Sequence, residues 1–177
     1  VGTAWTQVGQ DIDGKAAGEK SGYSVALAAD GSRVAVGAPF RDGGHVRIHE
    51  WDGTVWKQVG EDIDGEAASD YSGYSVALSA DGSRVAVGAS YNDGAGSNSG
   101  HVRIHDLVGT AWTQVGPDID GETANDYSGS SIALSADGNR VGIGAPWNDD
   151  SGRNSGQVRV YWVRCILFSL YVIDPSN

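Results

Sequence analysis

Closely spaced carboxylate side chains occur in two segments of this 177-residue chain, DIDGEAASD at 62–70 and DIDGETAND at 118–126. In each segment, oxygen-bearing side chains stand at positions one, three, five and nine. A calcium ion takes about six to eight oxygen ligands from a flexible loop, and alternating carboxylates can supply them. The segments therefore predict calcium ligands, which are Asp62, Asp64, Glu66, Asp70, Asp118, Asp120, Glu122 and Asp126. The alternative is a polar linker with an Asx-type turn, because the first copy of the segment has Lys15 where an acid is needed.

Two further segments, YNDGAGSNSG at 91–100 and WNDDSGRNSG at 147–156, combine an aromatic residue with Asn and Asp. Loops that carry such side chains can bind a protein or a glycan, because aromatic residues dominate binding surfaces. The candidate binding residues are Tyr91, Asn92, Asp93, Trp147, Asn148 and Asp149. The alternative is that these residues serve only the turn chemistry of the loops.

The segment HVRIH, at 45–49 and again at 101–105, alternates histidine and arginine with apolar residues. On a strand, His45, Arg47 and His49 share one face, and the two histidines are separated by about twice the roughly 6.6 Å that spans two residues. One metal ion could not bind both imidazoles. The third copy, QVRVY at 157–161, keeps only the arginine. We therefore expect a structural role, in which the arginine bonds to a loop or to a neighbouring unit.

No combination of residues predicts catalysis. The single cysteine, Cys165, lies in an apolar run, where burial raises the pKa of a thiol and makes it inert. The sequence contains no nucleophile elbow and no recognisable Ser, His and Asp set. Because an active site needs residues that differ from copy to copy, the repetition of this chain also argues against an enzyme.

The formal charge of −11 argues against nucleic acids and anionic membrane surfaces as partners, since both are bound through Lys and Arg. The apolar stretch at 160–173 is interrupted by Arg164 and is shorter than the roughly 20 residues of a membrane-spanning helix. We therefore expect no membrane insertion.

Three copies of one hairpin must position the candidate residues. They are SGYSVALAADGSRVAVGAP at 21–39, SGYSVALSADGSRVAVGAS at 72–90 and SGSSIALSADGNRVGIGAP at 128–146. In each copy two alternating runs flank Asp-Gly, which predicts a two-residue turn whose central positions both have positive φ. Alternation places Tyr23, Val25 and Leu27 on one face and small residues on the other. The bulky face of one copy can therefore pack on the small face of the next.

Each repeating unit holds the hairpin, an HVRIH-type strand and a WTQVG-type strand. Successive units begin at Trp5, Trp56 and Trp112. Four antiparallel strands in a period of about 40 to 50 residues are typical of a propeller blade, and blades must stack to bury their faces.

The combination of GYSVALSADGSRVAVGA with GHVRIH, at 73–89 and 100–105, resembles the FG-GAP repeat, the blade of the integrin α-subunit propeller. The resemblance extends to about Tyr161, although Ser21, Ser72 and Ser128 replace the Phe of the family name. It implies a calcium loop between the two hairpin strands. Here that position holds only AADGSR or SADGSR, which is too short to surround an ion.

We therefore expect an all-β chain of three four-stranded propeller blades that form a partial or open propeller over residues 1–163. The expected blades are 21–60, 72–116 and 128–163, the last completed by the tail or by residues 3–9, with an atypical strand or tail at 164–177. Three blades would leave an open arc with two exposed sheet faces. Because the chain begins inside a repeat, the remaining blades of a longer propeller or a second copy of the arc are expected partners.

The resemblance implies a secreted or cell-surface scaffold without catalytic activity or cofactor that binds a protein or a glycan in adhesion. Two alternatives remain open. The chain could be a surface repeat that calcium stabilises, or it could support an enzyme whose catalytic residues lie in other blades.

Overall fold

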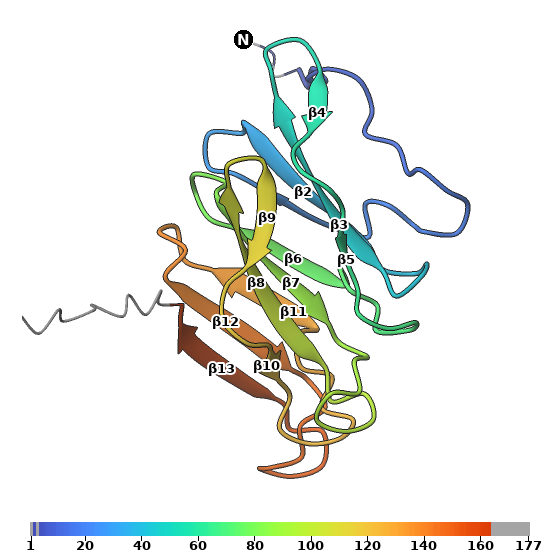
Figure 1. The fold of residues 1–177 in the computed structure, drawn as a ribbon. Coiled ribbons are helices and arrows are strands. Elements are labelled where there is room, and N and C mark those ends of the chain that lie inside the picture. Colours follow the sequence, from blue (N-terminus) through green and yellow to red (C-terminus); the bar gives the residue numbers. More distant parts are fainter. Residues whose placement is uncertain (1, 3, 164–177) are drawn as a thin grey trace, which may run out of the picture.

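The computed structural model describes residue 2 and residues 4–163, which form three antiparallel sheets without a helix (Figure 1). The first sheet contains β1 (Ser24–Leu27), β2 (Arg33–Ala38), β3 (His45–Trp51), β4 (Trp56–Gln58) and β5 (Ile63–Asp64). The second contains β6 (Ser75–Leu78), β7 (Arg84–Ala89), β8 (His101–Val108), β9 (Ala111–Gln114) and β10 (Ile119–Asp120). The third contains β11 (Ser131–Leu134), β12 (Arg140–Ala145) and β13 (Gln157–Trp162).

The hairpins form as expected, but their turns are longer than two residues. In the first copy Leu27 pairs with Val34, and the N–H of Gly31 donates to the carbonyl of Ala28 at 2.9 Å. Only the glycine of the Asp-Gly pair has positive φ, 74° at Gly31. The prediction of a two-residue turn was wrong because the aspartate keeps an ordinary backbone conformation. Its carboxylate accepts the N–H of Ser32 at 2.8 Å, which is an Asx-type contact.

The fourth strand of the first two sheets is split. Both β4 and β5 pair with β3, at opposite ends of that strand, and β9 and β10 pair with β8 in the same way. The DIDG segments thus contribute a short outer strand rather than a free linker.

The third sheet has three strands among the described residues. Of the two segments expected to complete it, the tail at 164–177 lies outside the described residues. The other is residues 3–9, and within its described part the carbonyl of Val8 accepts the indole N–H of Trp56, in the first sheet, at 2.9 Å. This segment therefore does not complete the third sheet.

The three sheets stack face to face, as the alternation of side-chain size predicts (Figure 1). Val85 and Val87 of the second sheet pack on Ala35, Val46 and Ile48 of the first. The second interface repeats this arrangement, with Val141 and Ile143 against Ala86, Val102 and Ile104. Small residues on one face leave room for the bulky residues of the next, so each interface is an apolar core.

Repeated hydrogen bonds reinforce both interfaces. The hydroxyl of Ser24 donates to the carbonyl of Gly73 at 2.7 Å, and Ser75 donates to Gly129 at 2.6 Å. At the hairpin turns, Arg84 donates to the carbonyl of Gly138 at 2.8 Å. The first and second sheets are thus each bonded to the loop that precedes the next hairpin and to the turn within it.

The outer faces of the stack are open, as expected for an arc. On the first sheet Val25 and Leu27 are 65% and 61% exposed, and on the third Val158 and Val160 are 74% and 68% exposed. The residues at the positions of Val158 and Val160 in the first two sheets are buried under a neighbouring sheet. No helix in the described part of the chain is long and apolar enough to span a bilayer.

Candidate functional site

The predicted calcium ligands lie at the end of the sheets where β3 and β8 begin, and they separate into several groups. Asp62 directly precedes the short strand β5 and Asp64 ends it, and both meet His45, with one ligand atom of each side chain within 4.8 Å of the others. The ammonium of Lys15 lies within this group, with its Nζ 3.0 Å from Oδ1 of Asp62. Burial opposes ionisation of Asp62, but hydrogen bonds from Lys15 and Gln58 outweigh it and lower the pKa of the carboxyl.

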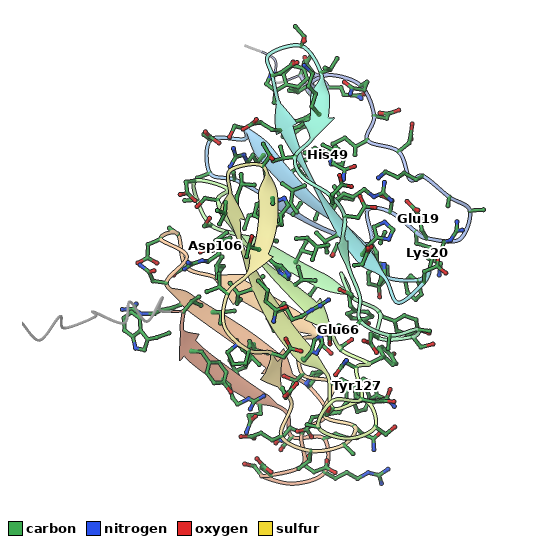
Figure 2. All side chains as sticks on the ribbon, viewed as in Figure 1. Glu19, Lys20, His49, Glu66, Asp106 and Tyr127 are labelled. Carbon is green, nitrogen blue, oxygen red and sulfur yellow. The ribbon has the colours of Figure 1, made fainter. Side chains whose placement is uncertain are left out.

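The second group joins residues of both predicted segments. Glu66 follows β5, whereas Asp118 precedes β10, and the two meet His101 at the start of β8 with ligand atoms within 4.8 Å of one another. Nδ1 of His101 lies 3.5 Å from Oδ2 of Asp118, and the imidazole is almost completely buried. Burial is also the main reason that the pKa of His101 is lowered. Figure 2 labels Glu66, which extends from the segment between the first two sheets.

The third group contains no histidine. Gln157 stands where the first two sheets have His45 and His101, and its Nε2 donates to Glu122 at 2.8 Å. Arg159 donates to the backbone carbonyl of Asp120 at 2.6 Å.

Asp70 and Asp126 lie apart from these groups and are buried. Each accepts a hydrogen bond from a predicted loop residue, Asp70 from Asn92 at 3.0 Å and Asp126 from Asn148 at 3.1 Å. Each also accepts the backbone N–H three residues earlier in its own segment. The eight predicted ligands are therefore distributed over several places instead of two nine-residue loops.

The other predicted loop residues differ in burial, since the two asparagines are buried, the two aspartates and Trp147 are exposed, and Tyr91 is half-buried. Asp93 and Asp149 stabilise their own loops by accepting backbone N–H groups five residues later, at 2.7 and 2.5 Å. Asn92 and Asn148 are buried. Trp147 is 53% exposed, and its surface is available to a ligand.

Tyr91 and Trp147 belong to a row of aromatic rings that crosses all three sheets (Figure 2, which labels Tyr127). Neighbouring ring centroids lie 4.7 to 6.5 Å apart along the order Tyr23, Phe40, Tyr71, Tyr91, Tyr127 and Trp147. Tyr74 joins the row beside Tyr23, at 5.1 Å. Sequence reasoning missed five of these rings, and the recurrence of Tyr before Ser-Gly at 71 and 127 was the available signal.

Two tyrosines of the aromatic row have strained backbones. Tyr71 and Tyr127 have φ of 56° and 53°, in the left-handed region that bulky side chains rarely adopt. Such strain persists only where the surroundings hold it, and it is concentrated at functional positions.

The arginines of the HVRIH-type strands bond to neighbouring units, as expected. Arg103 donates to the carbonyl of Asp64 at 2.7 Å, from the second sheet to the first. Arg47 has no preceding sheet to contact and forms a buried ion pair with Glu19. The same strand of the second sheet carries His105, where burial, reinforced by the charge of Arg103, lowers the pKa to about 4.

A groove of about 660 Å³ opens between the first two sheets beside His105, and Trp112 and Asp64 also line it. The indole N–H of Trp112 donates to the carbonyl of Val59 at 2.9 Å, which fixes one wall.

The sequence model of the FG-GAP repeat matches residues 63–104 and 119–161. This chain contains FG-GAP repeats. Each matched segment begins at the short outer strand of one sheet, β5 or β10, and ends in the third strand of the next, β8 or β13. The FG-GAP repeat is a β-propeller repeat, and the three stacked sheets are its blades. A comparison with curated proteins gave no match.

Solved structures resemble this FG-GAP chain at low sequence identity. A candidate 6-phosphogluconolactonase of Bacteroides uniformis is 14% identical, with a TM-score of 0.56 over 81% of this chain and 37% of that chain. Hydrazine synthase of Kuenenia stuttgartiensis is also 14% identical, with a TM-score of 0.49 over 79% of this chain and 33% of its own. TolB of Acinetobacter baumannii is 14% identical, with a TM-score of 0.47 over 82% and 30%. The chain thus spans about a third of the length of these structures.

Proposed function

We propose that this chain is a non-enzymatic binding scaffold and that its aromatic row is the ligand-binding surface. The observation that carries the proposal is the continuity of the row, which contains rings from all three blades in contact with one another. Aromatic side chains supply large contact areas at low entropic cost, and they dominate the energetics of protein interfaces. The positive φ recurs at the equivalent positions Lys20, Tyr71 and Tyr127, so the turn before each hairpin fixes where the two tyrosines of the row stand.

The charge of the chain favours a protein ligand with exposed Lys or Arg side chains. The formal net charge is −11, so a basic partner is attracted at long range. The rings also suit cations at contact distance, since Nζ of Lys20 already lies 4.1 Å from the ring centroid of Phe40. Secretion or display at a cell surface, and a role in adhesion, rest on analogy with other FG-GAP proteins.

Repetition supports the absence of catalysis. The pair of His45 and Asp62 at the start of β3 recurs as His101 and Asp118 at the start of β8, whereas a catalytic centre requires a unique set of residues.

A displayed peptide library tests the proposal, with a glycan array in parallel. We expect enrichment of peptides that contain Lys or Arg, and at least tenfold weaker binding of these peptides to the Trp147→Ala and Tyr91→Ala variants. Trp5→Ala is the matched control, because Trp5 is 98% exposed and lies outside the row. Equal binding by the row variants would refute the proposal, and enrichment of glycans alone would show that the ligand is a glycan.

A further inference from the structure

The chain contains three versions of one polar cluster, and they differ at only a few positions. The cluster combines the first residue of the HVRIH-type strand, the aspartate before the short outer strand, and the residue after the preceding DIDG. In the first version these are His45, Asp62 and Lys15, and in the second they are His101, Asp118 and Glu66. The third version has Gln157 and Glu122 at the first and last of these positions.

The second version has the donors and the spacing of a metal site. One nitrogen of His101 and one oxygen each of Glu66 and Asp118 lie within 4.8 Å of one another. Zinc binds imidazole nitrogen and carboxylate oxygen at about 2.0–2.2 Å, so small rotations of the exposed Glu66 side chain would close the site. Three protein ligands would leave a fourth position open to water.

The ligands of the second version are already positioned. The His101 side chain is 2% exposed and is therefore held by its surroundings. Nε2 of Gln114 donates to Oδ1 of Asp118 at 2.7 Å, which leaves Oδ2 directed toward the imidazole. Hydrogen bonds of this kind orient a ligand and raise its affinity for metal.

The first and third versions of the cluster lack features that a metal site needs. In the first, the ammonium of Lys15 lies 3.0 Å from Asp62, where a cation would sit, and Arg47 lies 3.6 Å from the same carboxylate. In the second version, the carboxylate of Glu66 occupies the position equivalent to the Lys15 ammonium. In the third, Gln157 donates a hydrogen bond to Glu122 and offers no imidazole.

One positive charge opposes binding in the second version. Nη1 of Arg103 lies 3.6 Å from Glu66, but the guanidinium is held by its hydrogen bond to the carbonyl of Asp64. Glu66 can therefore turn toward the imidazole while Arg103 stays in place. The repulsion should lower the affinity below that of dedicated zinc sites.

We propose that Glu66, His101 and Asp118 bind a divalent transition-metal ion of the zinc type and thereby join the first blade to the second. Glu66 belongs to the segment after β5 of the first sheet, whereas His101 begins β8 and Asp118 directly precedes β10 of the second sheet, so the ion would bridge the two blades. The imidazole favours zinc-type ions over calcium and magnesium, which prefer oxygen ligands only.

Titration calorimetry with zinc chloride, and thermal unfolding with zinc or with chelator, test the proposal. We expect one zinc ion per chain and a rise in Tm with zinc, because a ligand that binds only the folded state stabilises it. His101→Gln and Glu66→Lys should each weaken zinc binding at least tenfold. Both substitutions install residues that the chain itself has at equivalent positions, and circular dichroism verifies that each variant folds.

His45→Gln is the matched control and should leave zinc binding unchanged, because its cluster already contains Lys15. If His101→Gln does not fold, Asp118→Asn provides the same test, and bound cobalt reports the coordination through its visible absorption. Absence of zinc binding by the wild type, unchanged binding by the folded His101→Gln or Asp118→Asn variant, or a larger rise in Tm with calcium than with zinc would overturn the proposal.

Discussion

His105 should make the stability of this protein fall as the pH falls from 6.5 to 4. The imidazole is 6% exposed on β8, and the charges of Arg103, Asp118 and Asp106 act on it. Burial and the charge of Arg103 lower its pKa to about 4, and the two carboxylates only partly offset them. Between these pH values the unfolded chain binds a proton at this site and the folded chain does not. Protonation therefore favours unfolding throughout this range and has no effect above it.

The difference between a folded pKa of about 4 and an unfolded value near 6.5 corresponds to about 3 kcal/mol of unfolding free energy. For a chain of this size, that is a change in Tm of about 6–12 °C. The carboxylates of the chain also begin to titrate at the lower end of this range, so the wild type alone does not isolate the histidine. The His105→Gln variant does, because it keeps a neutral polar side chain of similar size.

Urea unfolding followed by tryptophan fluorescence, repeated at several pH values from 4 to 8, measures the effect. We expect the difference in unfolding free energy between wild type and variant to be constant above pH 7. It should shift by about 3 kcal/mol in favour of the variant by pH 4. Parallel curves for the two proteins from pH 7 to 4 would refute the reasoning, since they would show that the folded state accepts this proton as readily as the unfolded chain.

Three further substitutions test the packing of the blades by urea unfolding. Gly100→Ala should cost at least about 2 kcal/mol more than Gly109→Ala, because both glycines have positive φ but only at Gly100 would a Cβ overlap a backbone carbonyl. Equal costs would contradict this. Glu19→Gln should cost about 1.5–3 kcal/mol, because it removes the charged hydrogen-bond partner of buried Arg47 and leaves Asp62, at 3.6 Å, as its counter-charge. A loss below about 1 kcal/mol would show that Asp62 alone balances the guanidinium. Ser75→Ala should cost about 1 kcal/mol through its lost bond to the next blade, and an unchanged urea midpoint would show that this bond contributes nothing.

The aromatic row and the metal cluster share one end of the sheets but belong to separate proposals. The row consists of exposed and half-buried rings from all three blades, whereas the cluster depends on polar groups between two blades. The two proposals can therefore be tested separately. A protein that binds zinc but no peptide would support only the metal site, and one that binds peptides but no zinc would support only the aromatic row.

The order of residues along the chain is sufficient to predict the strands and their stacking. Large residues alternate with Ala and Gly in each hairpin, and a strand sends alternate side chains to opposite faces. Val85 and Val87 therefore meet the face of the preceding copy on which the same pattern places a small residue, Ala35. The FG-GAP character follows from the same repeated residues. The conformation of the Asp-Gly turns was predicted wrongly. The preference of the Asp-Gly dipeptide for two-residue turns does not take into account the hydrogen bond that each aspartate accepts within its own turn.

Only the tertiary structure decided which polar and aromatic side chains meet. Glu66 and Asp118 lie more than fifty positions apart, and they approach each other because one blade ends where the next begins. Asp70 stands only four residues after Glu66 but turns into the loop that contains Asn92. Rings from three hairpins form a row only after the blades have stacked. Local patterns determine which face a side chain occupies, but contacts between blades depend on the displacement and rotation of one sheet relative to the next, and no short segment encodes these.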